Sequence, residues 1–121
     1  MTVFLVEDSV EVRNRLRELL RSIAGLTIVG EAASPRDAIT GIRHSRPDAV
    51  LLDLSLEGGS GFEVLRDIHP EFPDIVFMVI TNNDSPVYAQ RAAKLGAAHY
   101  FDKSLQQDEL VSTLKQMTVR T

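Results

Sequence analysis

Three continuous apolar runs constrain the fold of this chain more than any other feature. They are Val3–Val6, Ala49–Leu52 and Ile75–Ile80, and each is four to six residues long. Runs this short and this rich in branched residues are typical of strands buried on both faces of a parallel sheet. Thr27–Ala32 and Ala98–Phe101 are shorter or more polar candidates, indicated by their β-forming residues. The sequence therefore predicts five strands.

Five helical segments alternate with these strands, each indicated by an apolar face or by a cap with proline or glycine at its ends. Alternation of this kind implies right-handed βαβ crossovers. We expect an α/β fold: a doubly wound five-stranded parallel sheet in the flavodoxin-like order 2-1-3-4-5, with five helices, forming one domain over residues 1–121. The helical signals are the face Val12, Leu16, Leu19, Leu20 and Ile23; the start Ser34-Pro35 with an end before Pro47; the capping box Ser60 and Glu63 with an end at Pro70 or Pro73; the start Ser85-Pro86 with an end at Gly96; and the face Leu110, Val111, Leu114 and Met117, capped by Ser104 and Gln107.

Composition excludes several functional classes. The chain has no cysteine, which excludes disulfides, thiolate catalysis and zinc–thiolate sites. A net charge of −4 gives no reason to expect direct nucleic-acid binding, and no apolar stretch indicates membrane insertion. The first strand leads into Glu7-Asp8 without the basic flank of a secretory signal, so we expect a cytoplasmic location.

Polar side chains follow four of the five predicted strands. Glu7-Asp8 follows the first strand, Asp53 the third, Thr81 the fourth and Lys103 the fifth. Ligands of open α/β sheets bind outside the carboxyl ends of the strands. Because these ends meet at one rim of a parallel sheet, we expect all five side chains to converge there.

Three carboxylates at one rim repel one another unless a cation compensates their charge. Mg²⁺ accepts one or two carboxylates and keeps positions open for phosphate oxygens. The Thr81 hydroxyl and the Lys103 ammonium suit two oxygens of a phosphoryl group. Taken singly, each residue has a simpler interpretation; Asp8 or Ser9, for example, suits the N-cap of the first helix. Their combination favours a phosphoryl-transfer site.

The order and spacing of these residues resemble those of response-regulator receiver domains, the phosphorylated modules of two-component signalling. The resemblance covers essentially the whole chain. It includes the glycine-rich segment Gly58–Gly61, the turn Leu95-Gly96-Ala97, and Tyr100 three residues before Lys103.

The resemblance implies roles for the acidic residues. Asp53 is similar to the family's phosphoacceptor, which takes a phosphoryl group from a sensor histidine kinase or a phosphotransfer protein. Asp8 resembles a direct Mg²⁺ ligand and Glu7 a water-mediated one. The backbone carbonyl of Ser55 is expected to complete the protein's share of the coordination.

It also implies a switch. Thr81 and Lys103 match the phosphoryl-contacting residues, and Tyr100 matches the aromatic side chain that changes rotamer on activation. The implied function is a signalling switch, not a turnover enzyme. The cognate kinase, the downstream partner, the phosphoryl lifetime and the oligomeric state stay open, as does the choice between a stand-alone regulator and a receiver excised from a longer protein.

Two positions depart from the family pattern. Ser104 follows Lys103 where many members have proline, so the usual cis peptide bond is expected to be absent. Asn82 follows Thr81 where many members carry a small residue, and its bulk is expected to slow attack by water or to restrict donors.

Three other functions compete with this interpretation. A haloacid-dehalogenase-like phosphatase needs a second Asp two residues after the nucleophile, where this chain has Ser55. A flavodoxin-like cofactor binder needs a phosphate loop after the first strand, and Glu7-Asp8 has the wrong charge for one. A scaffold that works without phosphorylation is disfavoured because all five site positions hold competent residues.

Arginines mark the polar face of the first predicted helix. This helix flanks the rim, so the arginines are candidates for docking a kinase or phosphotransfer protein. We favour a solvated face paired with Glu11 and Glu18, because such surface pairs are common and weak. The arginines are Arg13, Arg15, Arg17 and Arg21.

Overall fold

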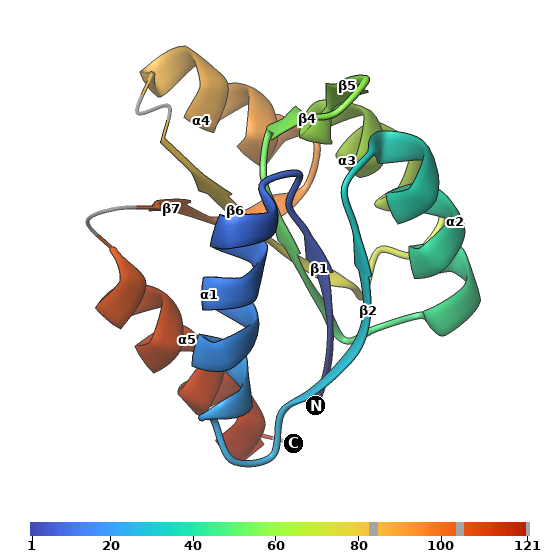
Figure 1. The fold of residues 1–121 in the computed structure, drawn as a ribbon. Helices are drawn as coiled ribbons and strands as arrows, with labels where there is room; N and C mark the ends of the chain where they lie inside the picture. Colours follow the sequence, from blue (N-terminus) through green and yellow to red (C-terminus); the bar gives the residue numbers. More distant parts are fainter. Residues whose placement is uncertain (83–84, 104–105, 121) are drawn as a thin grey trace.

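Five parallel strands form the central sheet in a computed structural model that describes residues 1–82, 85–103 and 106–120 (Figure 1). Their order is β2-β1-β3-β6-β7, which is 2-1-3-4-5 when only these strands are counted along the chain. The predicted fold class is confirmed. The strands are β1 (Thr2–Val6), β2 (Thr27–Ala32), β3 (Ala49–Leu52), β6 (Val76–Thr81) and β7 (Ala97–Asp102).

Every strand lies within one residue of its predicted bounds at each end. The difference that affects the site is in β6, which begins and ends one residue later than the apolar run Ile75–Ile80. Thr81 is therefore the last residue of the strand and pairs with Asp102 of β7. Ladder pairing with β7, and not hydrophobicity, decides where β6 ends.

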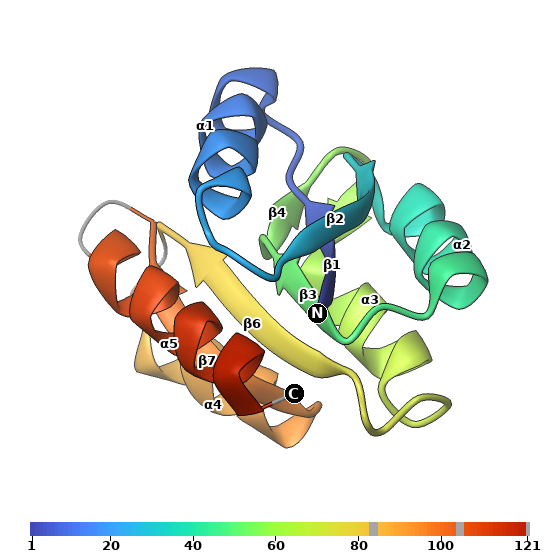
Figure 2. The same cartoon turned by 90° about the horizontal axis from the view of Figure 1, so that it is seen from below.

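Helices cover both faces of the sheet (Figure 2). Residues of α1 and α5 pack on one face, and residues of α2, α3 and α4 pack on the other. No helix in the described part of the chain is long and apolar enough to cross a membrane. The helices are α1 (Val10–Arg21), α2 (Pro35–Ser45), α3 (Gly61–Ile68), α4 (Pro86–Lys94) and α5 (Gln107–Arg120).

Alternation along β1 separates the two cores. Phe4 and Val6 pack with the helices α2 and α3, whereas Val3 and Leu5 pack with α1 and α5. All four side chains are buried. Burial of each such side chain contributes roughly 1.5–3 kcal/mol, which is why the short apolar runs form the centre of the fold.

Serine caps fix where α1, α2 and α3 start, and at α2 the Ser34 hydroxyl accepts from the Asp37 amide at 3.2 Å, as predicted. Ser9, not Asp8, caps α1: its hydroxyl accepts a hydrogen bond from the Val12 amide at 3.2 Å, and Asp8 is left exposed at the rim. Ser60 caps α3, but its hydroxyl accepts from the amide of Phe62, two residues on, instead of from the Glu63 amide that a capping box uses. The predicted capping box is therefore wrong.

The start of α5 is only partly tested. The helix begins at Gln107. Its predicted cap partner Ser104 lies outside the described residues, as does the peptide bond that joins Ser104 to Lys103.

A two-stranded hairpin follows β3 that the sequence analysis did not predict. Ser55–Leu56 (β4) pairs antiparallel with Gly59–Ser60 (β5) across a loop in which Gly58 has a φ of +78°. A side chain at Gly61 would collide with the Asp53 carbonyl, so glycine is required where the hairpin returns to the sheet. The hairpin thereby holds Ser55 beside Asp53.

Candidate functional site

Strand ends bring the predicted acidic residues together. Glu7 follows β1 and Asp53 follows the neighbouring β3, in which Leu52 pairs with Val6. One carboxylate oxygen from each of Glu7, Asp8 and Asp53 lies within 4.8 Å of the other two. Glu7 and Asp53 are 1% and 5% exposed, whereas Asp8 is exposed. Two buried carboxylates and one accessible carboxylate thus face one point of the rim.

Lys103 directly follows the edge strand β7, and its side chain reaches this cluster of carboxylates. Its Nζ lies 2.7 Å from Asp53 Oδ2 and 2.5 Å from Glu7 Oε1. The backbone helps to place it, because the Lys103 amide donates to the Thr81 carbonyl at 3.0 Å just past the end of the ladder between β6 and β7. In the described part of the chain, Lys103 is the one basic side chain joined to this cluster by an ion pair.

The electrostatics of the site show a shortage of positive charge. Burial, together with the nearby charge of Asp53, raises the pKa of Glu7 from 4.5 to about 7, although Lys103 and the Ser9 amide oppose the shift. Burial also lowers the pKa of Lys103. The hydrogen bonds that Lys103 forms with the carboxylates of Asp53 and Glu7 outweigh burial, so the pKa of Lys103 is raised overall. One lysine therefore does not fully compensate the carboxylates.

The two buried carboxylate oxygens of Glu7 have different partners. Oε2 accepts from the Ser9 amide at 3.1 Å, whereas the partner of Oε1 within the described residues is the Lys103 ammonium. Carboxylate oxygens grouped this closely suit a hard divalent cation, so the residues present fit Mg²⁺.

Asp53 is held by the segment that follows it. The Ser55 amide donates to Asp53 Oδ1 at 3.2 Å, and the Asp53 amide donates to the Val6 carbonyl at 3.0 Å. Thr81, at the end of the adjacent β6, is 3% exposed. The predicted residues Asp53, Ser55 and Thr81 thus come from neighbouring elements. Coordination by the Ser55 carbonyl stays a prediction.

Two further predicted residues lie around this site. Tyr100 is half-buried and packs with the core under α2, α3 and α4, while Phe101 packs with the opposite core, as strand alternation predicts. Asn82 is exposed and shares with Lys103 a groove of about 340 Å³ between α1 and α5. Its bulk therefore stands beside Lys103.

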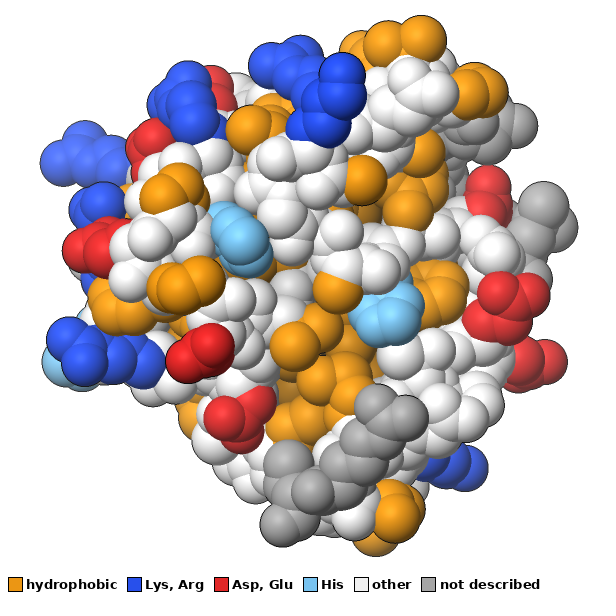
Figure 3. Space-filling model, turned by 180° about the vertical axis from the view of Figure 1, so that it is seen from behind, with side chains coloured by type: hydrophobic (Ala, Val, Ile, Leu, Met, Phe, Trp, Pro, Cys, Tyr) orange, Lys and Arg blue, Asp and Glu red, His pale blue; other side chains and the backbone are white. Residues whose placement is uncertain are grey.

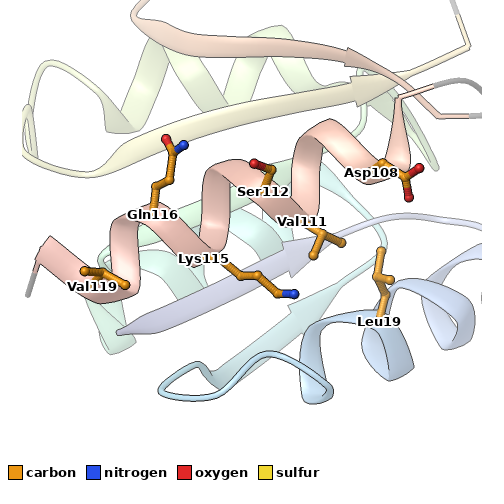
Figure 4. A pocket seen from close by; sticks show the side chains of 7 residues that line it. All are labelled: Leu19, Asp108, Val111, Ser112, Lys115, Gln116 and Val119. Carbon is orange, nitrogen blue, oxygen red and sulfur yellow. The ribbon is translucent and has the colours of Figure 1, made fainter.

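A larger groove, of about 770 Å³, lies further along α1 and α5 (Figure 4). Its lining contains none of the predicted site residues. The residues that line this larger groove are Leu19, Asp108, Val111, Ser112, Lys115, Gln116 and Val119.

The sequence favours an α1 face in which the arginines pair with Glu11 and Glu18. This is wrong for Arg13 and Arg17, which have other partners. Arg17 forms a two-pronged ion pair with Glu31 of β2, in which both N–O distances are 2.6 Å. Arg13 lies 3.4 Å from the same carboxylate and donates to the backbone carbonyl of Glu7 at 2.9 Å. Sequence reasoning missed these contacts with Glu31 and Glu7 because no local pattern reports contact between a helix and the neighbouring strands.

Candidate metal ligands outside the rim do not form a second group in the described ranges. There, Glu7, Asp8 and Asp53 are the one set of three acidic, histidine or cysteine residues close enough to share an ion. Figure 3 shows histidine side chains standing apart from one another on the face seen from behind.

Comparison with known proteins agrees with this geometry. A sequence profile of the response regulator receiver domain matches residues 3–115. The DNA-binding transcriptional activator DevR/DosR of Mycobacterium tuberculosis is 35% identical over 93% of this chain and 52% of its own length. The response regulator UvrY of Escherichia coli is 34% identical over 95% of this chain and 53% of its own.

Solved structures give the same result. A two-component response regulator of the LuxR family from Aurantimonas superposes with a TM-score of 0.90 at 30% identity, covering 98% of this chain and 84% of that one. A DNA-binding response regulator of the LuxR family from Staphylococcus aureus gives 0.88 at 25% identity, with 97% and 98% covered.

Parallel sheet, acidic rim and sequence profile together define a receiver module of two-component signalling. The chain belongs to the response regulator receiver domain family. It spans about half the length of the curated relatives that it matches.

Proposed function

We propose that this chain accepts a phosphoryl group on Asp53 from a phosphohistidine donor, in a Mg²⁺-dependent reaction, and that phosphorylation switches a partner-binding surface. One observation carries the proposal: Lys103 Nζ lies 2.7 Å from Asp53 Oδ2, inside a cluster of three carboxylates. A nucleophilic carboxylate held next to an ammonium group and a cation site suits phosphoryl transfer.

The chemistry follows from the placement of these side chains. An Asp53 carboxylate oxygen forms a bond to phosphorus while the N–P bond of the donor breaks and the electron pair stays on the imidazole nitrogen. When bound, Mg²⁺ offsets the negative charge of the phosphoryl oxygens. The Lys103 ammonium offsets further charge, and the Thr81 hydroxyl donates to a phosphoryl oxygen.

Asp8, Asp53 and the carbonyl of Ser55 would hold Mg²⁺ directly, and Glu7 would act through a water molecule. The grouping of one carboxylate oxygen each from Glu7, Asp8 and Asp53 within 4.8 Å supports this assignment. Asp8 is exposed and so is free to meet an ion that arrives from solvent.

The output step runs through Thr81 and Tyr100. A phosphoryl group binds Thr81 only in the phosphorylated state, and this differential contact is what can shift a two-state equilibrium. Movement of Thr81 toward Asp53 leaves room for Tyr100 of the neighbouring strand to turn inward. The surface formed by α4, β7 and α5 then changes and is read by a partner.

The partners follow from this chemistry. The donor is a sensor histidine kinase or a phosphotransfer protein. Two relatives are described as DNA-binding proteins. One of them, DevR/DosR, is longer than this chain, which matches 52% of its length. We assign the receiver segment itself no direct contact with nucleic acid, in keeping with its net charge of −4. It acts as one receiver domain over residues 1–121 and as a switch, not as a turnover enzyme. The cytoplasmic location stays a prediction.

Phosphorylation with acetyl phosphate tests the proposal directly. Intact-mass spectrometry of the wild-type protein with Mg²⁺ should show the mass of one added phosphoryl group, and EDTA should abolish it. Asp53→Asn should remain unmodified, because the amide is not a nucleophile. Added mass that maps to a serine, or labelling of Asp53→Asn equal to that of the wild type, would refute the assignment.

A further inference from the structure

The backbone of Glu7 is bonded on both sides just beyond the end of β1. Its amide donates to the Ala32 carbonyl of β2 at 3.0 Å, which continues the sheet by one bond. Its carbonyl accepts from Arg13 Nη1 at 2.9 Å. A side chain from α1 thus supplies the bond that fixes this carbonyl where the chain leaves the sheet.

Arg13 is itself oriented by Glu31. The two side chains are 19% and 24% exposed, and Arg13 Nε lies 3.4 Å from Glu31 Oε1. Arg17 holds both oxygens of the same carboxylate at 2.6 Å, and its Nη1 also donates to Asn14 at 2.8 Å. Glu31 belongs to β2, where it pairs in register with Leu5 of β1. The arginine is therefore tied to the same pair of strands that carries Glu7.

We propose that Arg13, oriented by Glu31, is a positioning residue for the metal-binding carboxylates of Glu7 and Asp8. The proposal rests on the function proposed above. Its physical basis is the planar peptide bond: the Glu7 carbonyl and the Cα atoms of Glu7 and Asp8 lie in one plane. A hydrogen bond that fixes the carbonyl therefore fixes the direction in which Asp8 leaves the strand.

The positive charge of Arg13 must be balanced by a carboxylate if Arg13 is to lie beside a cation site. A free guanidinium beside a cation site would repel the incoming ion. Here the Glu31 carboxylate faces the arginines and stays ionised, because the hydrogen bond from Arg17 lowers its pKa. Arg13 can then act on the metal site through the Glu7 carbonyl as a hydrogen-bond donor. Outer residues that orient metal ligands in this way commonly change metal affinity by about 10–100-fold.

The network also contains its own control. Arg17 binds Glu31 as tightly as any residue of the network, but its hydrogen bonds run to Glu31 and Asn14, away from the Glu7 carbonyl. Arg17→Met should weaken the packing of α1 on β2 without removing the donor to Glu7. Arg13→Met removes that donor and keeps a side chain of similar length.

Isothermal titration calorimetry with Mg²⁺ alone tests the proposal on the wild type and both variants, alongside thermal melts in EDTA. We expect Arg13→Met to raise the Mg²⁺ dissociation constant about tenfold. Arg17→Met should change it less than twofold, although both variants melt earlier than the wild type. Arg13→Lys should recover part of the affinity, because an ammonium group can still donate to the Glu7 carbonyl.

Three outcomes would overturn the inference: an unchanged dissociation constant for Arg13→Met, an equal loss in Arg17→Met, or no recovery in Arg13→Lys. If Arg13→Met does not fold, Arg13→Lys and Glu31→Gln give the same comparison, and Glu31→Gln should weaken Mg²⁺ binding more than Arg17→Met does. A wild type that binds no Mg²⁺ would instead refute the proposed function.

Discussion

Two clusters of carboxylates and basic side chains flank β1, and they differ in charge balance. At the rim, Lys103 pairs with Glu7 and Asp53, and Asp8 lies beside them without an ion pair among the described residues. On the side of α1, Arg13 and Arg17 share the single carboxylate of Glu31. The pKa of Glu7 is raised to about 7 at the rim, chiefly by burial. The pKa of Glu31 is lowered, chiefly by its hydrogen bond from Arg17.

The difference separates a structural network from a binding site. Every carboxylate oxygen of Glu31 has a basic partner, so nothing further is needed there. At the rim, three carboxylates lie together and the ion pairs of the described residues bring them one ammonium, so the rim has a deficit of positive charge that a cation removes. The same residue types thus produce a stable contact in one place and a ligand site in the other.

The largest effect on stability is expected from removing the ammonium group of Lys103. Lys103→Met in EDTA should lower the free energy of unfolding by about 3 kcal/mol, since it leaves buried carboxylates without a partner. Urea denaturation measures this loss. Saturating Mg²⁺ should restore most of it. A Lys103→Met protein as stable as the wild type would mean that the carboxylates do not need compensation.

Mg²⁺ itself should have the next largest effect. At a concentration one hundred times its dissociation constant, it should stabilise the wild type by about 2.7 kcal/mol and raise the melting temperature by about 10 °C. Asp8→Asn should lose most of this gain, because it removes the exposed ligand. An equal gain in Asp8→Asn would place the ion elsewhere.

In the metal-free protein, the stability contributed by Glu7 and the stability contributed by Glu31 should change with pH in opposite directions. Because the folded-state pKa of Glu7 lies near 7, above the usual 4.5, the stability it contributes is complete below about pH 4.5 and is lost as the pH rises through 7. Relative to Glu7→Gln, the wild type should lose about 2 kcal/mol between these limits, after allowance for coupling to Lys103. Melts in EDTA from pH 5 to 8 measure this difference. A constant difference across that range would contradict it.

Glu31 should show the smallest effect and the opposite sign. Because its pKa is lowered in the folded state, its contribution is present above its usual 4.5 and is lost as the pH falls through the folded-state value. Glu31→Gln should cost less than about 1 kcal/mol at pH 7, because the ion pair is about one quarter exposed. The two proteins should become equally stable in acid. A difference that grows in acid would show that Glu31 is not held as an anion.

The hairpin after Asp53 shows one limit of reasoning from sequence. Gly58 permits the turn through its φ of +78°, but the paired strands Ser55–Leu56 and Gly59–Ser60 are too short to have a hydrophobic pattern. Their pairing depends on the close packing of Gly61 against the backbone carbonyl of Asp53. A contact of that kind is made only when the sheet has formed.

The sheet, its strand order and the residues at the strand ends follow from the amino-acid sequence. Short apolar runs bury both faces of a strand, and parallel strands bring their ends to one rim, so the pattern of residue types is enough to group Glu7, Asp53, Thr81 and Lys103. Which charges are compensated depends instead on the tertiary structure. The pairing of Arg13 and Arg17 with Glu31, and of Lys103 with Glu7 and Asp53, joins elements distant along the chain. Charge compensation is a matter of distance and burial, which a linear pattern of residue types does not contain.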